Sequence, residues 1–228
     1  MIEENEGSVH LIRNLERVSP QKSIFNYKSG RKAFLSLGQG NIHEWLKTLL
    51  PNTRIIIEPK IIGLGIGIQY INGKLNKAIN KNSHDITDMV RSLKNIPKCI
   101  PVKNRIEIRG VIYDDKNTSN KNVETELLQI QNFKPELSGL RFCAFQIFHC
   151  NINHFQSLQE LKNLNFEIPQ TQFTNLISDI EIYIKCWEEG KLFKRYPTNG
   201  IVLKINSRKL QKNLGENNLS IHWAYAIN

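Results

Sequence analysis

The chain has 228 residues, of which 40% are hydrophobic, so it can bury a proper core as one large domain or two small ones without disulfide staples. Its formal net charge of +10 indicates a polyanionic partner: nucleic acid is the first candidate, an acidic membrane surface the second, and a generic basic surface the plain alternative. No apolar stretch approaches the roughly 20 residues that cross a bilayer, and the acidic start MIEENEG is unlike a signal peptide, so we expect a cytoplasmic protein that does not enter a membrane.

The beginning of the chain is polar and mixed in charge, and it ends in a boundary rich in Pro, Ser and Gly. We predict an N-terminal appendage over residues 1–32, with a short helix at 10–18, and a single domain over residues 33–228. Within that domain the hydrophobic spacing first predicts a helix over 42–49, closed by Pro51.

Alternating and apolar runs then predict a series of strands. The first two strands precede Asn72-Gly73, the dipeptide that best fits a two-residue hairpin turn. The expected strands are 54–60, 63–71, 74–81, 104–114, 140–148, 199–206 and 221–228. Further helices are expected over 85–96, 154–166 and 177–193, with Asp85 capping the first of them and Pro97 ending it. Hairpins with helices between them favour an α+β fold, in which helices cover antiparallel sheets.

Three patterns that suggest other kinds of site are incomplete. None of the four cysteines forms a C-x-x-C pair, so they are expected to be buried apolar residues: Cys99, Cys143, Cys150 and Cys186. The stretch FHCNINH brings His149 and His154 near a cysteine, but its spacing fits no standard zinc pattern, and we predict no metal site. The GLGIG run lacks the third glycine and the following helix of a dinucleotide-binding fingerprint.

Charged residues recur on strands that are otherwise apolar. They are Glu58, Lys60, Glu107, Arg109 and Lys204. Burying an unpaired charge is costly, so these side chains either alternate outward to water or line a shared cleft.

Four short motifs around these residues occur in the order and spacing of one known family: E-P-K, R-x-E-x-R-G, N-G-x-V-x-K and W-A-x-A. From about Ala33 to its end, the chain resembles the adenylation domain of NAD-dependent bacterial DNA ligases. The resemblance implies a ligase-type, ATP-grasp-like nucleotidyltransferase fold with antiparallel sheets flanked by helices. It also implies DNA as a partner.

In this family the lysine at the position of Lys60 attacks the α-phosphorus of a nucleotide and forms lysyl-AMP, and the adenylate then passes to a 5′-phosphate on nicked DNA. The attacking amine must be neutral, so we expect the pKa of Lys60 to lie below the usual value of about 10.4, through partial burial and a nearby cation such as Lys204. Lys204 and Arg109 are the candidates for stabilising charge on the phosphate. The nucleotide-binding residues implied are Glu58 at the adenine, Leu35, Ser36 and Leu37 along the adenine pocket, Gly63 of the K-x-D-G motif, and Lys81 in place of an arginine.

The chain also departs from the family pattern. Ile62, Val111 and Asn199 stand where the family has carboxylates, and the W-A-x-A-F-K motif ends at Asn228 without its lysine. Because phosphoryl chemistry depends on positioning and charge neutralisation, a site without these acids should bind Mg²⁺ poorly. NAD⁺ and ATP both remain candidate adenylate donors.

The resemblance also bears on what surrounds the domain. The helical module that recognises the nicotinamide end has no visible counterpart in residues 1–32, and no DNA-wrapping segment follows the last motif. We therefore expect that a separate protein would have to supply the missing parts for complete ligation. Three functions stay open: an enzyme that adenylates Lys60, a degenerate module that binds nucleotide or nucleic acid, and a scaffold for a protein partner.

Overall fold

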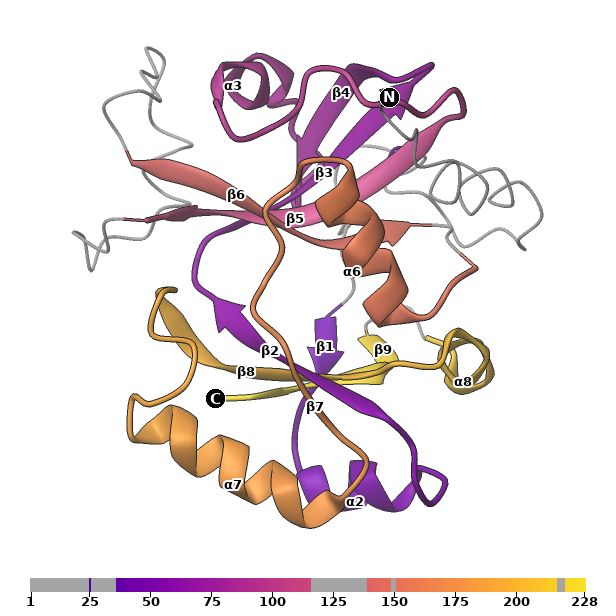
Figure 1. Ribbon diagram of the computed structural model, residues 1–228, viewed down its shortest axis with the longest axis vertical. Coiled ribbons are helices and arrows are strands. Elements are labelled where there is room, and N and C mark those ends of the chain that lie inside the picture. The colour runs from indigo at the N-terminus through magenta and orange to yellow at the C-terminus, as the bar shows by residue number, and fades with distance from the viewer. Residues whose placement is uncertain (1–24, 26–35, 116–138, 149–150, 217–219) are drawn as a thin grey trace, which may run out of the picture.

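The computed structural model describes residue 25 and residues 36–115, 139–148, 151–216 and 220–228. Two sheets lie one above the other, with helices along their outer sides (Figure 1). This confirms the α+β fold of antiparallel sheets flanked by helices. The expected helix at 10–18 and Leu35 lie outside the described residues, and the boundary at residue 32 stays a prediction.

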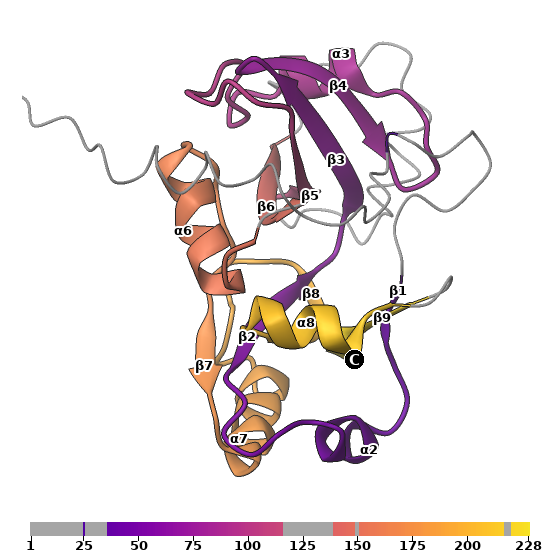
Figure 2. The same ribbon diagram turned by 90° about the vertical axis from the view of Figure 1, so that its right-hand side faces the viewer.

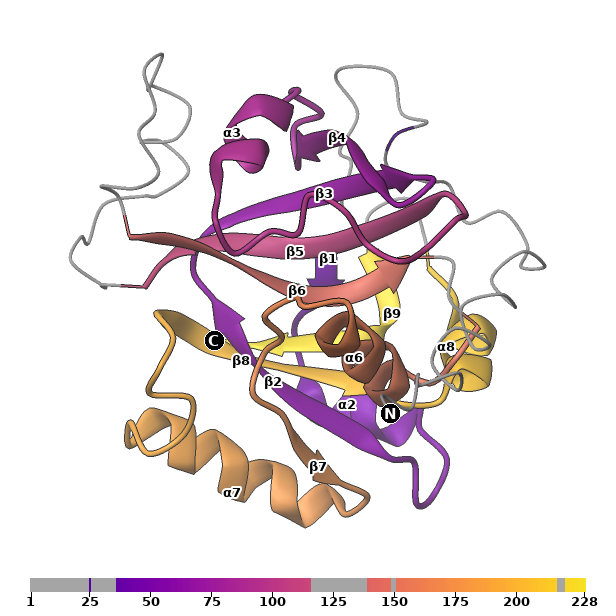
Figure 3. The same ribbon diagram turned by 45° about the horizontal axis from the view of Figure 1, so that its top comes forward.

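The five-stranded sheet has the order β1-β9-β8-β2-β7. Its strands are β1 (Ser36–Gly38), β9 (Ser220–Ile227), β8 (Thr198–Ile205), β2 (Ile55–Ile61) and β7 (Gln172–Thr174). All neighbours are antiparallel except β1 and β9. The helices α7 (Ile177–Glu188) and α2 (Ile42–Lys47) lie below this sheet in Figure 1, and Figure 3 shows α7 there again. Ile55 and Ile57 of β2 pack against α7 residues such as Ile180, because alternate residues of a strand face the same side.

The four-stranded sheet has the order β4-β3-β5-β6. Its strands are β3 (Leu64–Ile71), β4 (Lys74–Asn80), β5 (Ile106–Asp114) and β6 (Leu140–Phe148). A core of isoleucines from β3 and β5 packs against the helices α3 (Thr87–Ser92) and α6 (His154–Asn163). Asn72 and Gly73 both have positive φ, 50° and 75°, as a tight primed hairpin turn requires, which confirms the predicted β3–β4 hairpin.

The helix expected over 85–96 is much shorter in the structure. Asp85 lies before the helix and its Oδ1 accepts from the Thr87 amide at 3.0 Å, while Ile86 holds the N-cap position. Leu93 is already extended, at φ −70° and ψ 126°, so α3 ends well before Pro97. The Asx-type contact of Asp85 thus precedes the helix, and the extended backbone at Leu93 ends it, although the apolar spacing continues. The elements β1, β7 and α8 (Arg208–Leu214) were not predicted.

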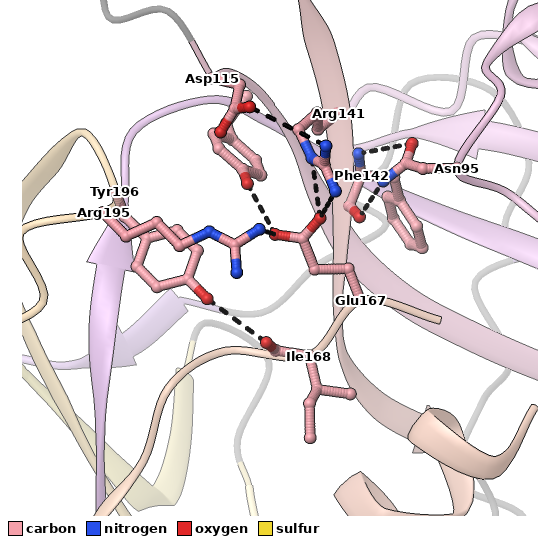
Figure 4. A network of polar contacts seen from close by, with 9 residues as sticks. Asn95, Asp115, Arg141, Phe142, Glu167, Ile168, Arg195 and Tyr196 are labelled. Carbon is pink, nitrogen blue, oxygen red and sulfur yellow. Dashed lines mark hydrogen bonds and ion pairs between the residues drawn. The ribbon is translucent and has the colours of Figure 1, made fainter. Parts of the chain in front are cut away.

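A carboxylate beyond α6 joins the four-stranded sheet to the segment that leads into β8. Glu167 accepts hydrogen bonds from Tyr113 Oη at 2.7 Å, from Arg141 Nη2 at 2.7 Å and from Arg195 Nη2 at 3.1 Å (Figure 4). Burial and the hydrogen bond to Glu167 raise the pKa of Tyr113, so this hydroxyl stays a donor. The Tyr113 and Tyr196 rings also meet edge to face, with centroids 5.8 Å apart.

Glu167→Gln is expected to lower the free energy of unfolding by about 1–3 kcal/mol, because it removes the charge that two guanidinium groups share. Urea unfolding at neutral pH measures the loss. Glu181→Gln, on the exposed face of α7, is the matched control and should stay within about 0.5 kcal/mol of the parent. Equal effects of the two substitutions would show that the network contributes nothing.

In the part of the chain that the structure describes, no helix has the length and apolar character needed to cross a membrane.

Candidate nucleotide site

The strand β2 carries the residues singled out as a nucleophile motif. Its register with β8 pairs Ile56 with Lys204 and Glu58 with Val202, which puts Glu58 and Lys204 diagonally opposite on one face of the sheet. β7 pairs with β2 only over residues 55–57, so beyond this point β2 is a sheet edge among the described residues. A residue without an amide hydrogen, such as Pro59, is tolerated there.

Lys60 lies where the chain leaves one sheet for the other. β2 ends at Ile61 and β3 begins at Leu64, and the chain rises between them from the five-stranded to the four-stranded sheet (Figure 2). The β2–β8 register shifts at Lys60, where β8 carries one extra residue. Such bulges redirect nearby side chains. Gly200 lies in this bulge with φ 149°, and a Cβ there would come within 1.9 Å of the Ile227 carbonyl oxygen, so only glycine fits.

A cavity of about 280 Å³ lies beside this crossing. Both sheets line it, and the five-stranded sheet contributes residues of β1 and β9 as well as of β2 and β8. Its wall includes Leu37, Glu58, Lys60, Gly63, Arg109, Val111, Cys143, Phe145, Phe148, Lys204, Glu216 and Trp223. Apolar and aromatic walls with a few converging charges are typical of a small-molecule site.

Glu58 and Lys204 form a buried ion pair in the wall of this cavity. Lys204 Nζ lies 2.7 Å from Glu58 Oε2, and the two residues are 6% and 2% exposed. His154 Nε2 lies 2.5 Å from the other oxygen, Glu58 Oε1. Burial opposes ionisation of Glu58, but the charge of Lys204 and the contact with His154 outweigh it and lower the pKa of Glu58 to about 2. Glu58 is therefore an acceptor throughout the physiological range.

Lys60 reaches the cavity from the end of β2. Its Nζ donates a hydrogen bond to Asn228 Oδ1. Asn228 stands where the W-A-x-A-F-K motif of the family has its lysine. Burial lowers the pKa of Lys60, as expected from the sequence. Burial alone causes this shift, so the expected contribution of Lys204 to the pKa of Lys60 is not found.

Arg109 enters the cavity from β5. Its Nε donates to Glu107 Oε1 at 2.8 Å, and its guanidinium carbon lies 3.7 Å from the centroid of the Phe148 ring. The ion pair and the stacking hold the planar group in place, which is what recognition of a phosphate requires.

The remaining predicted residues divide into three groups. Leu37 and Gly63 line the cavity, and a Cβ on Gly63 would come within 2.1 Å of the Ile112 carbonyl oxygen. Ser36 lies in β1 and Lys81 just after β4, and the cavity wall among the described residues includes neither. Leu35 is outside the described residues. The sequence did not single out His154 as a partner of Glu58, nor Phe145 and Trp223 as wall residues.

The three replaced acids have different surroundings. Val111 is buried in the cavity wall, whereas Ile62 is 43% exposed and Asn199 is exposed on β8. Over the described ranges, no group of three or more His, Cys, Asp or Glu side chains could hold a metal ion. Of the two carboxylates in the described cavity wall, Glu58 already contacts Lys204 and His154 through its two oxygens, and Glu216 is exposed. These side chains do not suit a protein-held Mg²⁺.

Two stacked antiparallel sheets with a lysine at the crossing and a charged cavity between them define a ligase-type nucleotidyltransferase domain. The model of the NAD-dependent DNA ligase adenylation domain matches residues 32–136 and 135–228. The chain therefore belongs to the family of NAD-dependent DNA ligase adenylation domains.

Curated relatives agree with this assignment. A DNA ligase of Metamycoplasma arthritidis is 28% identical over 98% of this chain and 37% of its own length. A DNA ligase of Mesoplasma florum is 28% identical over 77% of this chain and 30% of its own length. The chain thus spans about a third of the length of these relatives.

Solved structures support the fold. A Lig E DNA ligase described as binding DNA with a minimal scaffold matches with a TM-score of 0.52 at 12% identity, over 85% of this chain and 68% of that one. A putative ATP-dependent DNA ligase from Aquifex aeolicus matches with a TM-score of 0.51 at 13% identity, over 77% of this chain and 47% of that one.

Proposed function

We propose that this domain binds an adenosine nucleotide in the cavity between its sheets and that Lys60 accepts the adenylyl group. The observation that carries the proposal is the Lys60 amine, which lies at the cavity with its pKa lowered by burial. A neutral amine has the lone pair that nucleophilic attack needs.

The step forms one bond and breaks another. Lys60 Nζ attacks the α-phosphorus, a phosphorus–nitrogen bond forms, and the bond to the departing phosphate oxygen breaks. The leaving group is nicotinamide mononucleotide if NAD⁺ is the donor and pyrophosphate if ATP is the donor, and the amine loses its proton to solvent. Arg109 and Lys204 are the cations of the cavity wall that would stabilise charge on the α-phosphate.

The family favours NAD⁺ as the donor, since the chain belongs with NAD-dependent adenylation domains. The net charge of +10 and the names of the relatives favour DNA as the acceptor.

Intact-mass measurement of the purified chain after incubation with NAD⁺ or ATP and Mg²⁺ tests whether Lys60 is adenylated and which donor is used. The expected result is the added mass of one adenylyl group, larger in yield with NAD⁺. A folded chain that gains no mass with either donor would refute the proposal.

The rate of adduct formation is expected to rise with pH, about tenfold per unit, and to level off below the usual lysine pKa of about 10.4. Burial lowers the pKa of Lys60, so the neutral amine becomes the main form at a lower pH than in a free lysine. Initial rates of mass gain between about pH 6 and pH 10 measure this profile. A rate that does not change over this range would contradict a step in which the amine must first lose its proton.

The replacement of family residues at the site favours a second candidate function. Val111 occupies a carboxylate position in the cavity wall, and Asn228 contacts Lys60 where the family has a lysine. A domain of this kind could keep nucleotide or nucleic-acid binding and lose the chemistry. Binding of duplex DNA that weakens steeply with salt, together with an unmodified Lys60, would favour this reading.

A further inference from the structure

A histidine that the proposed chemistry does not use makes a buried contact with Glu58, a residue of the cavity wall. His154 is the first residue of α6, which packs on the four-stranded sheet, whereas Glu58 belongs to β2 of the five-stranded sheet. His154 Nε2 lies 2.5 Å from Glu58 Oε1, and the two residues are 5% and 2% exposed. The contact therefore joins the two layers at the wall of the cavity.

The start of α6 is fixed to the strands that carry the ion pair. The His154 amide donates to the Asn206 carbonyl at 2.9 Å, and the Phe155 amide donates to Asn206 Oδ1 at 3.0 Å. Asn206 directly follows β8, and its own amide donates to the Arg54 carbonyl just before β2, at 2.9 Å. The imidazole is thus held in one place relative to Glu58 and Lys204.

The charges around the imidazole decide its form. The groups that face it are Glu58, Lys204 and Arg208. Burial and the charge of Lys204 lower the pKa of His154, so the ring is neutral, and an ionised Glu58 can only accept. The proton therefore lies on Nε2, and His154 donates to Glu58 Oε1 while Lys204 donates to Oε2.

We propose that His154 is a positioning residue that presents Glu58 to the amino group of a bound adenine. Glu58 lines the cavity, and its two oxygens are fixed by His154 and Lys204, so only its remaining lone pairs are available to a base. Those lone pairs accept from the exocyclic amino group of adenine and repel the oxygen that hypoxanthine carries at the same place. This inference rests on the proposed nucleotide site.

The test compares two substitutions that differ in reach. A glutamine amide nitrogen lies about where Nε2 of histidine does, whereas that of asparagine lies closer to the backbone and cannot reach Glu58. In the full chain, calorimetric affinities for AMP and for IMP give a ratio that reports on the base alone. His154→Asn is expected to lower the AMP-to-IMP preference by about tenfold, the effect of losing a hydrogen bond to a charged group, and His154→Gln is expected to keep it.

The outcomes separate the two proposals. If the parent chain binds neither nucleotide, the proposed function is overturned, and the role of His154 falls with it. If the parent prefers AMP and both variants keep that preference, only the role of His154 is overturned. A loss of general stability alone would lower both affinities and leave the ratio unchanged.

A second measurement covers the case in which His154→Asn does not fold. The ¹⁵N shifts of the His154 ring in the parent chain are expected to show a proton on Nε2 and none on Nδ1 at pH 7. A ring that carries its proton on Nδ1, or on both nitrogens, at this pH overturns the proposal.

Discussion

Lys60→Arg is expected to leave the chain folded and to abolish the adenylyl adduct. A guanidinium keeps its proton, with a pKa above about 12, so it has no lone pair with which to attack phosphorus. The positive charge at the cavity stays, which separates loss of the nucleophile from loss of charge. Intact mass after incubation with NAD⁺ is the readout, and thermal unfolding should remain within a few degrees of the parent because Lys60 is only partly buried.

The matched control is Lys47→Arg. Lys47 lies exposed in the last turn of α2 and is not part of the cavity wall. It should gain the adenylyl mass as the parent does. An adduct that persists in Lys60→Arg would place the nucleophile elsewhere, and peptide mapping would then identify the modified residue.

The strands and longer helices were predictable because their patterns extend over enough residues. The β3–β4 hairpin follows from Asn72-Gly73 between two alternating runs, and α6 and α7 follow from apolar residues at helical spacing. β1 and β7 have three residues each, too few to show a period. The helix α8 did have a local signal, because Ser207 is its N-cap and accepts from the Leu210 amide at 3.4 Å.

The candidate site was predictable where its residues share a strand and not where they meet across the fold. Glu58 and Lys60 are two positions apart on β2, and a regular strand places such residues on the same side. His154 meets Glu58 across 96 positions of sequence. The local sequence shows only that a helix begins there, because Asn153 and Gln156 are spaced to cap it, and the Asn153 amide does donate to Gln156 Oε1 at 3.2 Å. No periodicity in the sequence reveals which strand the His154 ring contacts.

The burial of charge across β2 and β8 makes the ion pair the most sensitive point of the site. Lys204→Met removes the cation and leaves the Glu58 carboxylate buried with only His154 beside it. The free energy of unfolding at pH 7 is expected to fall by about 3–5 kcal/mol, as it does when one partner of a buried pair is lost. Urea unfolding measures this loss, and Lys47→Met on the exposed side of α2 is the control.

The pH dependence of the same variant has a definite sign. In the parent, the pKa of Glu58 is lowered to about 2, so its contribution is present above the usual value of 4.5 and is lost as the pH falls from 4.5 towards 2. In Lys204→Met the burial remains without the cation, so the pKa of Glu58 rises and protonation relieves the buried charge. The stability difference between parent and variant should therefore narrow as the pH falls from 7 to about 4.

The double variant Glu58→Gln, Lys204→Met separates stability from function. With no charge left to bury, most of the stability lost in Lys204→Met should return, because neutral replacements of buried pairs are often tolerated. Adenylation of Lys60 should not return, since both the acceptor for the base and a cation for the phosphate are gone. A double variant that regains both stability and the adduct would show that this ion pair serves only the fold. A double variant that regains neither would show that His154 alone cannot hold the uncharged side chain at position 58 in place.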